Sequence, residues 1–195
     1  MHPDAQRWND RYRQASGPRR FEVDARLQAV AHLLGPPGSA LELACGTGAN
    51  AMWLAAQGWS LCGVDVSIEG VRIASAEALR RGLSMRWVVA DATRPALSAG
   101  GQFALIVVMR FLDRRVFPFI RDALAPDGQV FYATFNQGAL VHHPDFNPRF
   151  VLAPGELRAA FPGFEVQATQ DEEQMSWLLA RKPGRFSPRR RSAAS

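Results

Sequence analysis

The amino-acid sequence predicts an α/β fold in which helices cover both faces of a mostly parallel β-sheet. Short apolar runs alternate with segments of helical periodicity along most of the 195 residues, as expected for parallel strands joined by helical connections. A glycine-rich turn at residues 44–48 joins the first of these apolar runs to a helical pattern. Near the C-terminus, the strand-like runs 163–169 and 175–180 flank a short acidic turn and therefore predict an antiparallel hairpin.

The individual elements follow from the residue pattern. An amphipathic helix is expected at 22–34, and the residues Gly35-Pro36-Pro37-Gly38 end it. Ser67 precedes another helical pattern and is expected to cap it. Residues 136–149 are polar and irregular, and a short helix is expected at 153–161. The remaining expected strands lie at 40–44, 60–65, 84–90, 102–109 and 128–135, and the helices between most of them lie at 50–57, 68–81 and 114–124.

Length and composition indicate one folded domain, which we expect to span residues 1–181. Apolar residues at 47% and charged residues at 21% are ordinary globular values and exclude wholesale disorder. No apolar run approaches the roughly 20 residues that a membrane span needs, and the N-terminus lacks a signal-peptide pattern, so a cytoplasmic protein is expected. Cys45 and Cys62 have no metal-type spacing, so we expect free buried thiols and no metal site. A monomer and a homodimer both remain open.

The basic character of the chain comes from its C-terminal end. Residues 182–195 carry Lys182 and four arginines without an acid, which equals the whole chain's net charge of +5 and leaves the rest near neutral. This Pro-, Gly-, Ser- and Arg-rich segment is expected to be a disordered tail. It could contact RNA through counterion release, although a solvated extension without a function is the simpler interpretation. A nucleic-acid partner is therefore possible only through the tail.

The glycine-rich turn predicts the class of ligand. Gly46 and Gly48 have no Cβ and can let backbone amides approach a cofactor at the carboxyl end of a strand. A dinucleotide would place its pyrophosphate at the following helix N-terminus, where the nearby carboxylate of Glu42 would repel it. S-adenosylmethionine carries a sulfonium, an ammonium and no phosphate, so it suits that carboxylate better.

Four motifs in order resemble those of class I S-adenosylmethionine-dependent methyltransferases. Glu42-x-x-Cys45-Gly46-x-Gly48 resembles the first motif, and Asp65 and Asp91 close the next two apolar runs. The run 103–109 followed by 124–130 resembles the fourth strand, the next helix and an "L-x-P-G-G" turn. The resemblance implies a Rossmann-like sheet of seven strands, mostly parallel with an antiparallel last strand. It also implies methyltransferase activity with S-adenosylmethionine as the cofactor.

The resemblance also implies which residues contact the cofactor. Asp65 would accept both ribose hydroxyls and Asp91 with Ala92 would meet the adenine, whereas a strand-end cap and an Asx turn are the structural alternatives for the two acids. Met109 and Arg110 would line the transfer channel. The complete expected set is Glu42, Ala44, Cys45, Gly46, Thr47, Gly48, Asn50, Asp65, Val66, Ser67, Asp91, Ala92, Met109, Arg110, Trp8 and Arg11.

The N-terminal segment carries a further resemblance. Trp8-Asn9-Asp10-Arg11-Tyr12 resembles the "W-[DN]-x-R-Y" element of small methyltransferases of the tellurite-resistance and thiopurine types, in which this segment covers the cofactor. Residues 1–20 are therefore expected to form a lid whose aromatic rings face the sulfonium. The alternative is a helix whose Trp8 and Tyr12 simply pack on the core. Residues 147–157 resemble a segment of the tellurite-resistance-like proteins.

The catalytic residues and the acceptor are less well defined by the sequence. Arg110, His142, His143 and Tyr12 are candidates, with a salt bridge for Arg110 and inert loop positions for the histidines as alternatives. No Asn-Pro-Pro-Tyr or Asp-Pro-Pro-Tyr motif follows the fourth strand, which counts against a DNA or protein-glutamine acceptor. We expect methyl transfer to a small molecule, either anionic or a soft nucleophile. The alternatives are an RNA or protein methyltransferase that docks through its tail, an NAD(P) oxidoreductase using the G-x-G-x-x-A pattern at 46–51, and a cofactor-binding regulator.

Overall fold

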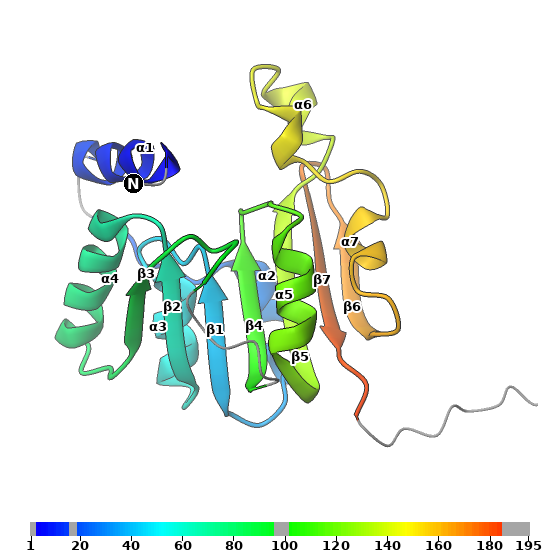
Figure 1. Ribbon diagram of the computed structural model, residues 1–195, viewed down its shortest axis with the longest axis horizontal. Coiled ribbons are helices and arrows are strands. Elements are labelled where there is room, and N and C mark those ends of the chain that lie inside the picture. Colours follow the sequence, from blue (N-terminus) through cyan, green and yellow to red (C-terminus); the bar gives the residue numbers. More distant parts are fainter. Residues whose placement is uncertain (1–2, 16–18, 96–101, 185–195) are drawn as a thin grey trace, which may run out of the picture.

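The chain is built around one seven-stranded sheet with the strand order β3-β2-β1-β4-β5-β7-β6 (Figure 1). The computed structural model describes residues 3–15, 19–95 and 102–184. β1 to β5 pair in parallel, and β7 runs antiparallel between β5 and β6. The predicted mostly parallel sheet with its antiparallel last strand is therefore confirmed. The strands are β1 Ser39–Leu43, β2 Ser60–Asp65, β3 Arg86–Val89, β4 Phe103–Met109, β5 Leu124–Phe135, β6 Glu165–Asp171 and β7 Met175–Arg181.

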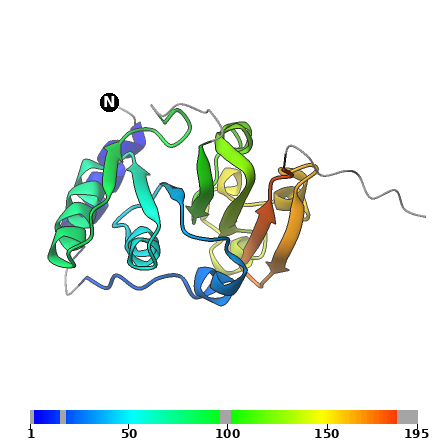
Figure 2. The same cartoon turned by 90° about the horizontal axis from the view of Figure 1, so that it is seen from below.

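Helices cover both faces of this sheet, as Figures 1 and 2 show. α5 and α7 lie on one face, and α2 and α3 lie on the other. α1 packs on α4, which lies beside β2 and β3. The helices are α1 Pro3–Gln14, α2 Ala25–Ala29, α3 Ala49–Ala56, α4 Ile68–Arg80, α5 Val116–Ala123, α6 Ala139–His142 and α7 Glu156–Ala159, with 3₁₀ turns at Ala31–Leu33 and Pro148–Phe150.

The central strands separate two apolar cores. In β4, Ile106 and Val108 pack toward α5, and Leu105 and Val107 pack toward the α2 and α3 face. All four of these side chains are fully buried, so alternate residues serve opposite cores. Strands that are buried on both faces read as continuous apolar runs, which is why the sequence predicts this sheet so directly.

The expected helix at 22–34 is wrong in extent. Residues 19–24 form no helix, and the helical part is divided between α2 and a 3₁₀ turn at Val30. The Asp24 side chain caps α2 by accepting from the Arg26 amide at 3.0 Å, while the Asp24 amide donates to Asn50 at 2.9 Å. These two contacts fix the backbone of Asp24 in an extended conformation and start the helix at Ala25.

Two further boundaries differ from expectation. α6 lies within residues 136–149, where only irregular structure was expected. β5 begins at Leu124, so the "L-x-P-G-G"-like segment lies within the strand, and Asp127 takes the left-handed conformation there (φ 62°).

β7 ends at Arg181, close to the predicted domain boundary. Of the expected tail, residues 185–195 lie outside the described residues, as do residues 1–2 and 16–18 of the expected lid.

Among residues 3–15, 19–95 and 102–184, no helix is both long enough and apolar enough to cross a bilayer. The same part of the chain holds no group of three or more His, Cys, Asp or Glu side chains suited to a metal ion.

Candidate functional site

A pocket of about 540 Å³ opens where β1 and β4 end at the carboxyl edge of the sheet. Its walls come from the bend after β1, from the end of β4, from α1 and from the segment that leads into α2. The carboxyl edge of a parallel sheet is the usual place for a ligand in such folds. Of the sequence-predicted residues, the pocket walls include Glu42, Ala44, Cys45, Gly46, Thr47, Asn50, Met109, Arg110 and Tyr12.

The bend after β1 is built from left-handed residues. Ala44 (φ 53°), Gly46 (φ 54°) and Gly48 (φ 75°) turn the chain sharply into α3. A Cβ at Gly46 would lie 2.7 Å from the Tyr12 hydroxyl oxygen, and one at Gly48 would lie 2.5 Å from the Trp87 ring. Both distances are shorter than ordinary Cβ contacts, so a side chain at either glycine would displace its neighbour, and the left-handed backbone would add strain.

Glu42 is a carboxyl group buried beneath this bend. Its side chain accepts from the Asn50 amide nitrogen and from the Ala51 backbone N–H, each at 3.0 Å. Glu42 is only 2% exposed, and burial raises its pKa to about 7 against the opposing effect of these two hydrogen bonds. The group is therefore poised between its neutral and charged forms near neutral pH, on the wall of the pocket.

Asp65 ties the end of β2 to the same bend. One carboxylate oxygen accepts from the Gly46 amide at 2.7 Å, and the other accepts from the Ser67 amide at 2.8 Å. Burial raises the pKa of Asp65, and the backbone N–H groups oppose that shift by stabilising the charged form. Asp65 thus holds the bend in place. It is not itself a wall of the 540 Å³ pocket, although Gly46 is.

The remaining expected cofactor residues are not among the residues that line the pocket. Asp91 accepts from the Thr93 amide at 2.8 Å, which is the Asx turn considered as its structural alternative. The Trp8 ring stacks on Tyr12 with ring centroids 5.9 Å apart, and the Arg11 guanidinium lies 5.1 Å from the centroid of Trp8. The complete set outside the pocket walls is Gly48, Asp65, Val66, Ser67, Asp91, Ala92, Trp8 and Arg11.

The sequence did not single out the ionic network beside this pocket. Arg26 forms salt bridges with two acids, with Asp24 at 3.2 Å and with Glu172. Arg110 also pairs with Asp24 at 3.2 Å, so the salt bridge weighed as its alternative role is present. The hydrogen bonds from Arg26 lower the pKa of Glu172. The sequence carries no local signal for the pair of Arg26 with Glu172, because 146 residues separate them.

A second pocket of about 370 Å³ adjoins the first and shares Arg26 and Arg110 with it. Phe135, Glu172 and Glu173 form part of its wall. His142 and His143 are both exposed, and His142 bonds to Glu173 at 2.6 Å and so contacts the rim of this pocket. The structure therefore connects His142, but not His143, to the second pocket.

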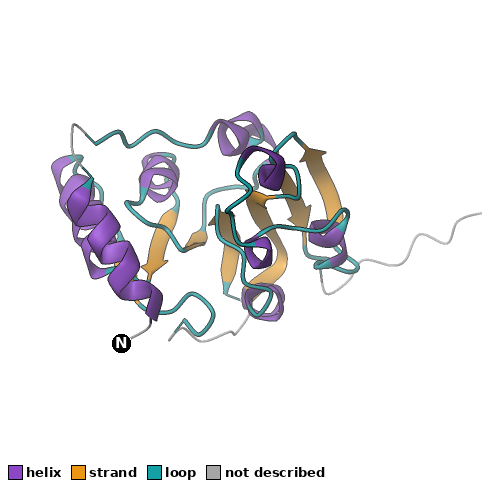
Figure 3. Cartoon of the chain, turned by 90° about the horizontal axis from the view of Figure 1, so that it is seen from above, coloured by secondary structure: helices purple, strands orange, loops and turns teal. Residues whose placement is uncertain are grey.

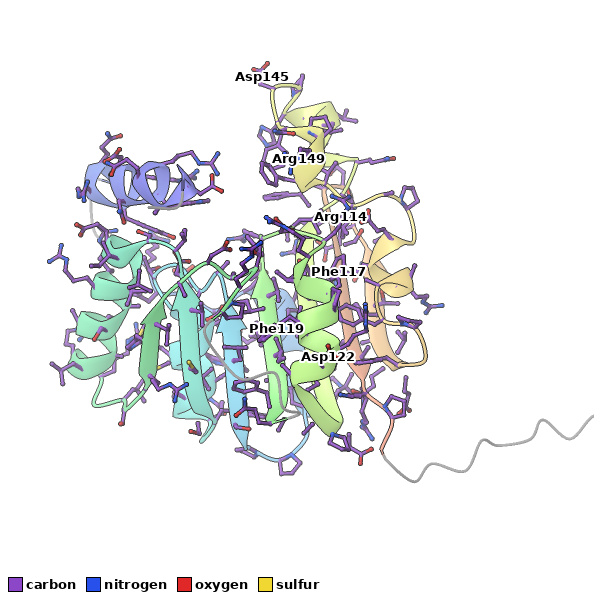
Figure 4. The ribbon with its side chains drawn as sticks, in the orientation of Figure 1. Arg114, Phe117, Phe119, Asp122, Asp145 and Arg149 are labelled. Atoms are coloured by element: carbon purple, nitrogen blue, oxygen red, sulfur yellow. The ribbon has the colours of Figure 1, made fainter. Side chains whose placement is uncertain are left out.

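The segment that carries these histidines rises above the sheet between β5 and α7 (Figure 1). Figure 4 shows Asp145 at its tip, with Arg149 and then Arg114 below it. Arg114 donates to the carbonyl oxygens of Arg149 at 2.8 Å and Val151 at 3.1 Å, and it pairs with Glu156 at 2.6 Å. These bonds anchor the base of the segment to the loop before α5.

Comparisons with known proteins match part of the chain to a methyltransferase family. Residues 40–128 match the family described as "Methyltransferase domain". The chain is 40% identical over 70 residues to the ribosomal RNA small subunit methyltransferase C of Alcanivorax borkumensis, covering 35% of this chain and 22% of that protein. It is 26% identical over 102 residues to the ubiquinone biosynthesis O-methyltransferase of Salmonella paratyphi A, covering 50% and 42%. The chain thus spans less than half the length of both curated relatives.

Solved structures share the fold at low sequence identity. TehB from Haemophilus influenzae superposes with a TM-score of 0.71 at 14% identity, over 91% of this chain and 66% of that one. A structure from work on the conversion of a disulfide bond into a thioacetal group during echinomycin biosynthesis gives 0.75 at 20% identity, over 94% of both chains. A geranyl diphosphate methyltransferase in complex with GPP and sinefungin gives 0.68 at 14% identity, over 81% and 77%. The fold is that of the class I methyltransferases.

The raised pKa of Glu42 predicts how stability depends on pH. The folded protein holds the Glu42 proton more tightly than the unfolded chain, whose carboxyl has a pKa near 4.5. The resulting stabilisation is complete below pH 4.5 and is lost as the pH rises through about 7. We expect the unfolding free energy of the wild type, minus that of Glu42→Gln, to fall by on the order of 3 kcal/mol across this window.

Urea unfolding of both proteins at several pH values between 4 and 8 measures this difference. Groups common to both proteins, including the histidines, cancel in the subtraction. Two curves that stay parallel across the window would show that Glu42 has an ordinary pKa in the folded protein.

Proposed function

We propose that this chain, which carries a class I S-adenosylmethionine-dependent methyltransferase domain, transfers a methyl group from S-adenosylmethionine to a small-molecule acceptor. The observation that carries the proposal is the buried Glu42 carboxyl under the glycine bend, with Asp65 on the other side of Gly46. Two acids at a bend that opens a helix favour a ligand with positive charge and no phosphate.

The hydrogen bonds of the bend support the same donor. A pyrophosphate would need free backbone N–H groups at the start of α3. The Gly46 amide already donates to Asp65 at 2.7 Å, and the Ala51 amide donates to Glu42 at 3.0 Å. The sulfonium and ammonium groups of S-adenosylmethionine require acceptors instead, and carboxylates supply them. An NAD(P) oxidoreductase fits this arrangement less well.

We propose specific contacts for the methionine end, the ribose and the methyl group of the donor. The methionine end of the donor would lie against Gly46 and Thr47, with its ammonium near Glu42. Asp65 accepts the Gly46 N–H on one oxygen and the Ser67 N–H on the other, and because a carboxylate oxygen can accept more than one donor, the ribose hydroxyls would bond to the same group. Met109 at the end of β4 would face the transferred methyl group.

The second pocket is the proposed acceptor site because it adjoins the donor pocket at Arg110. The Arg110 side chain is 60% exposed and presents N–H groups that suit one anionic group of an acceptor. Phe135 and Met175 add apolar wall, which suits a soft nucleophile. In-line displacement needs mainly alignment and exclusion of water, so these residues act by positioning the acceptor.

An RNA acceptor is the second candidate because the chain is 40% identical to a ribosomal RNA methyltransferase over 70 residues. The charges of the proposed acceptor pocket argue against an RNA acceptor. Glu172 and Glu173 line that pocket, so two carboxylates would face a polyanionic backbone. Nucleic-acid surfaces gather cations against phosphates instead. A small acceptor with one anionic group, satisfied by Arg110, fits the charges better.

Loss of the Asp65 carboxylate tests the donor site. We expect Asp65→Ala to weaken binding of S-adenosylhomocysteine by about 1–3 kcal/mol, the usual consequence of removing buried hydrogen-bond partners. Asp122→Ala is the matched control because that side chain lies on α5 below the carboxyl edge (Figure 4). Isothermal titration calorimetry measures both. An Asp65→Ala protein that binds as tightly as the Asp122→Ala control would remove Asp65 from the donor site.

Turnover with an acceptor panel tests the activity itself. The wild type is incubated with methyl-labelled S-adenosylmethionine and, separately, with small thiols, small carboxylates, inorganic oxyanions and total RNA. We expect label in the small anionic or soft nucleophiles, and a rise in KM for the anionic ones on Arg110→Gln. Labelling confined to RNA would overturn the small-molecule proposal.

A further inference from the structure

Asn9 is a buried polar residue on α1 that contacts the first turn of α4. α1 crosses above α4, as Figures 1 and 3 show. Asn9 is 5% exposed and shares a helix face with Ala5 and Tyr12, at spacings of four and three residues. The amide of an asparagine is costly to bury without hydrogen-bond partners, so the partners of Asn9 show how this face of α1 is held in the structure.

The Asn9 side-chain oxygen accepts two hydrogen bonds from α4. The Ser67 hydroxyl donates to it at 2.6 Å, and the Glu69 backbone N–H donates at 3.3 Å. Ser67 is itself fully buried and caps α4 by accepting from the Gly70 amide at 3.1 Å. A single side-chain oxygen of α1 is therefore part of the N-terminal cap of α4.

Two sets of contacts connect Asn9 to the donor site, one through Ser67 and one through Tyr12. Ser67 donates its backbone N–H to Asp65 at 2.8 Å, so the residue that bonds Asn9 also orients the Asp65 carboxylate. Three residues beyond Asn9, the Tyr12 ring lies between Gly46 and Gly70. A Cβ on Gly46 would lie 2.7 Å from the Tyr12 hydroxyl, and a Cβ on Gly70 would lie 2.9 Å from the Tyr12 ring. Tyr12 in turn is a wall of the donor pocket.

We propose that Asn9 is a positioning residue for the methyl-donor site, because its two hydrogen bonds fix α1 on α4 and thereby hold Tyr12 as a wall of the donor pocket beside Asp65. The inference rests on the proposed function, since it assumes that this pocket binds the donor. Asn9 touches neither the donor nor the acceptor. It acts through Tyr12 and through Ser67.

The chain offers a conservative variant for this position. The substitution Asn9→Asp would keep an oxygen for Ser67 and Glu69, and the new charge would lie at the N-terminus of the 13-residue helix α4, where anions are favoured. Asn9→Leu has nearly the same volume and no acceptor. Gln6→Leu is the control on the same helix, because Gln6 is exposed and its amide donates to Asp10 within α1. A role confined to folding would not separate these variants by donor affinity.

The test measures S-adenosylhomocysteine affinity by calorimetry, at least 15 °C below the unliganded melting midpoint of every variant. We expect Asn9→Leu to raise the Kd at least tenfold, while Asn9→Asp and Gln6→Leu stay within about threefold of the wild type. We also expect the double variant Asn9→Leu/Tyr12→Leu to bind more tightly than the product of the two single losses predicts, because Asn9 acts in part through Tyr12.

Three results would overturn the inference. Asn9→Leu could bind like the wild type, Asn9→Asp could lose as much affinity as Asn9→Leu, or the two single losses could multiply in the double variant. Should Asn9→Leu fail to fold, Asn9→Ala, which also lacks the side-chain oxygen, takes its place in the affinity measurement and in the cycle with Tyr12→Leu. A wild type that binds no S-adenosylhomocysteine would instead contradict the proposed function.

Discussion

The buried carboxyl of Glu42 is the constraint on which the rest of the site depends. It lies at the end of β1 and takes up hydrogen bonds from the Asn50 side chain and the Ala51 backbone at the start of α3. An acid in that place both fixes the first turn of the helix and removes N–H groups that a phosphate would use. The bend between Glu42 and Ala51 is therefore shaped for a cationic ligand, while its glycines provide the close approach.

The same carboxyl organises segments that are distant in sequence. Asn50, which donates to Glu42, accepts the backbone N–H of Asp24 at 2.9 Å and so holds the extended approach to α2 against the bend. Asp24 pairs with Arg26, and Arg26 pairs with Glu172 in the turn before β7. One continuous set of polar contacts thus joins the donor pocket to the wall of the second pocket. Through these contacts, the positions of α2 and of the β6–β7 turn depend on the geometry around Glu42.

The sequence predicts the parts of this molecule that depend on local pattern. Buried strands read as apolar runs, and the acid and glycine spacing placed Glu42, Gly46 and Asp65 together. Pairs such as Arg26 with Glu172 could not be predicted, because 146 residues separate them and only the folded sheet brings them together. The helix expected at 22–34 failed for a similar reason, since the distant Asn50 fixes Asp24. The four residues of α6 are too few to show a helical period.

Proton release on binding of S-adenosylmethionine tests the central claim most directly. At pH 6 a carboxyl with a pKa of about 7 is mostly protonated, and a cationic donor must ionise it. Calorimetric titrations in two buffers of different ionisation enthalpy measure the protons exchanged. The account predicts that the wild type releases nearly one proton, that release fades by pH 8, and that Glu42→Gln releases none. Binding without proton release at pH 6 would contradict the account.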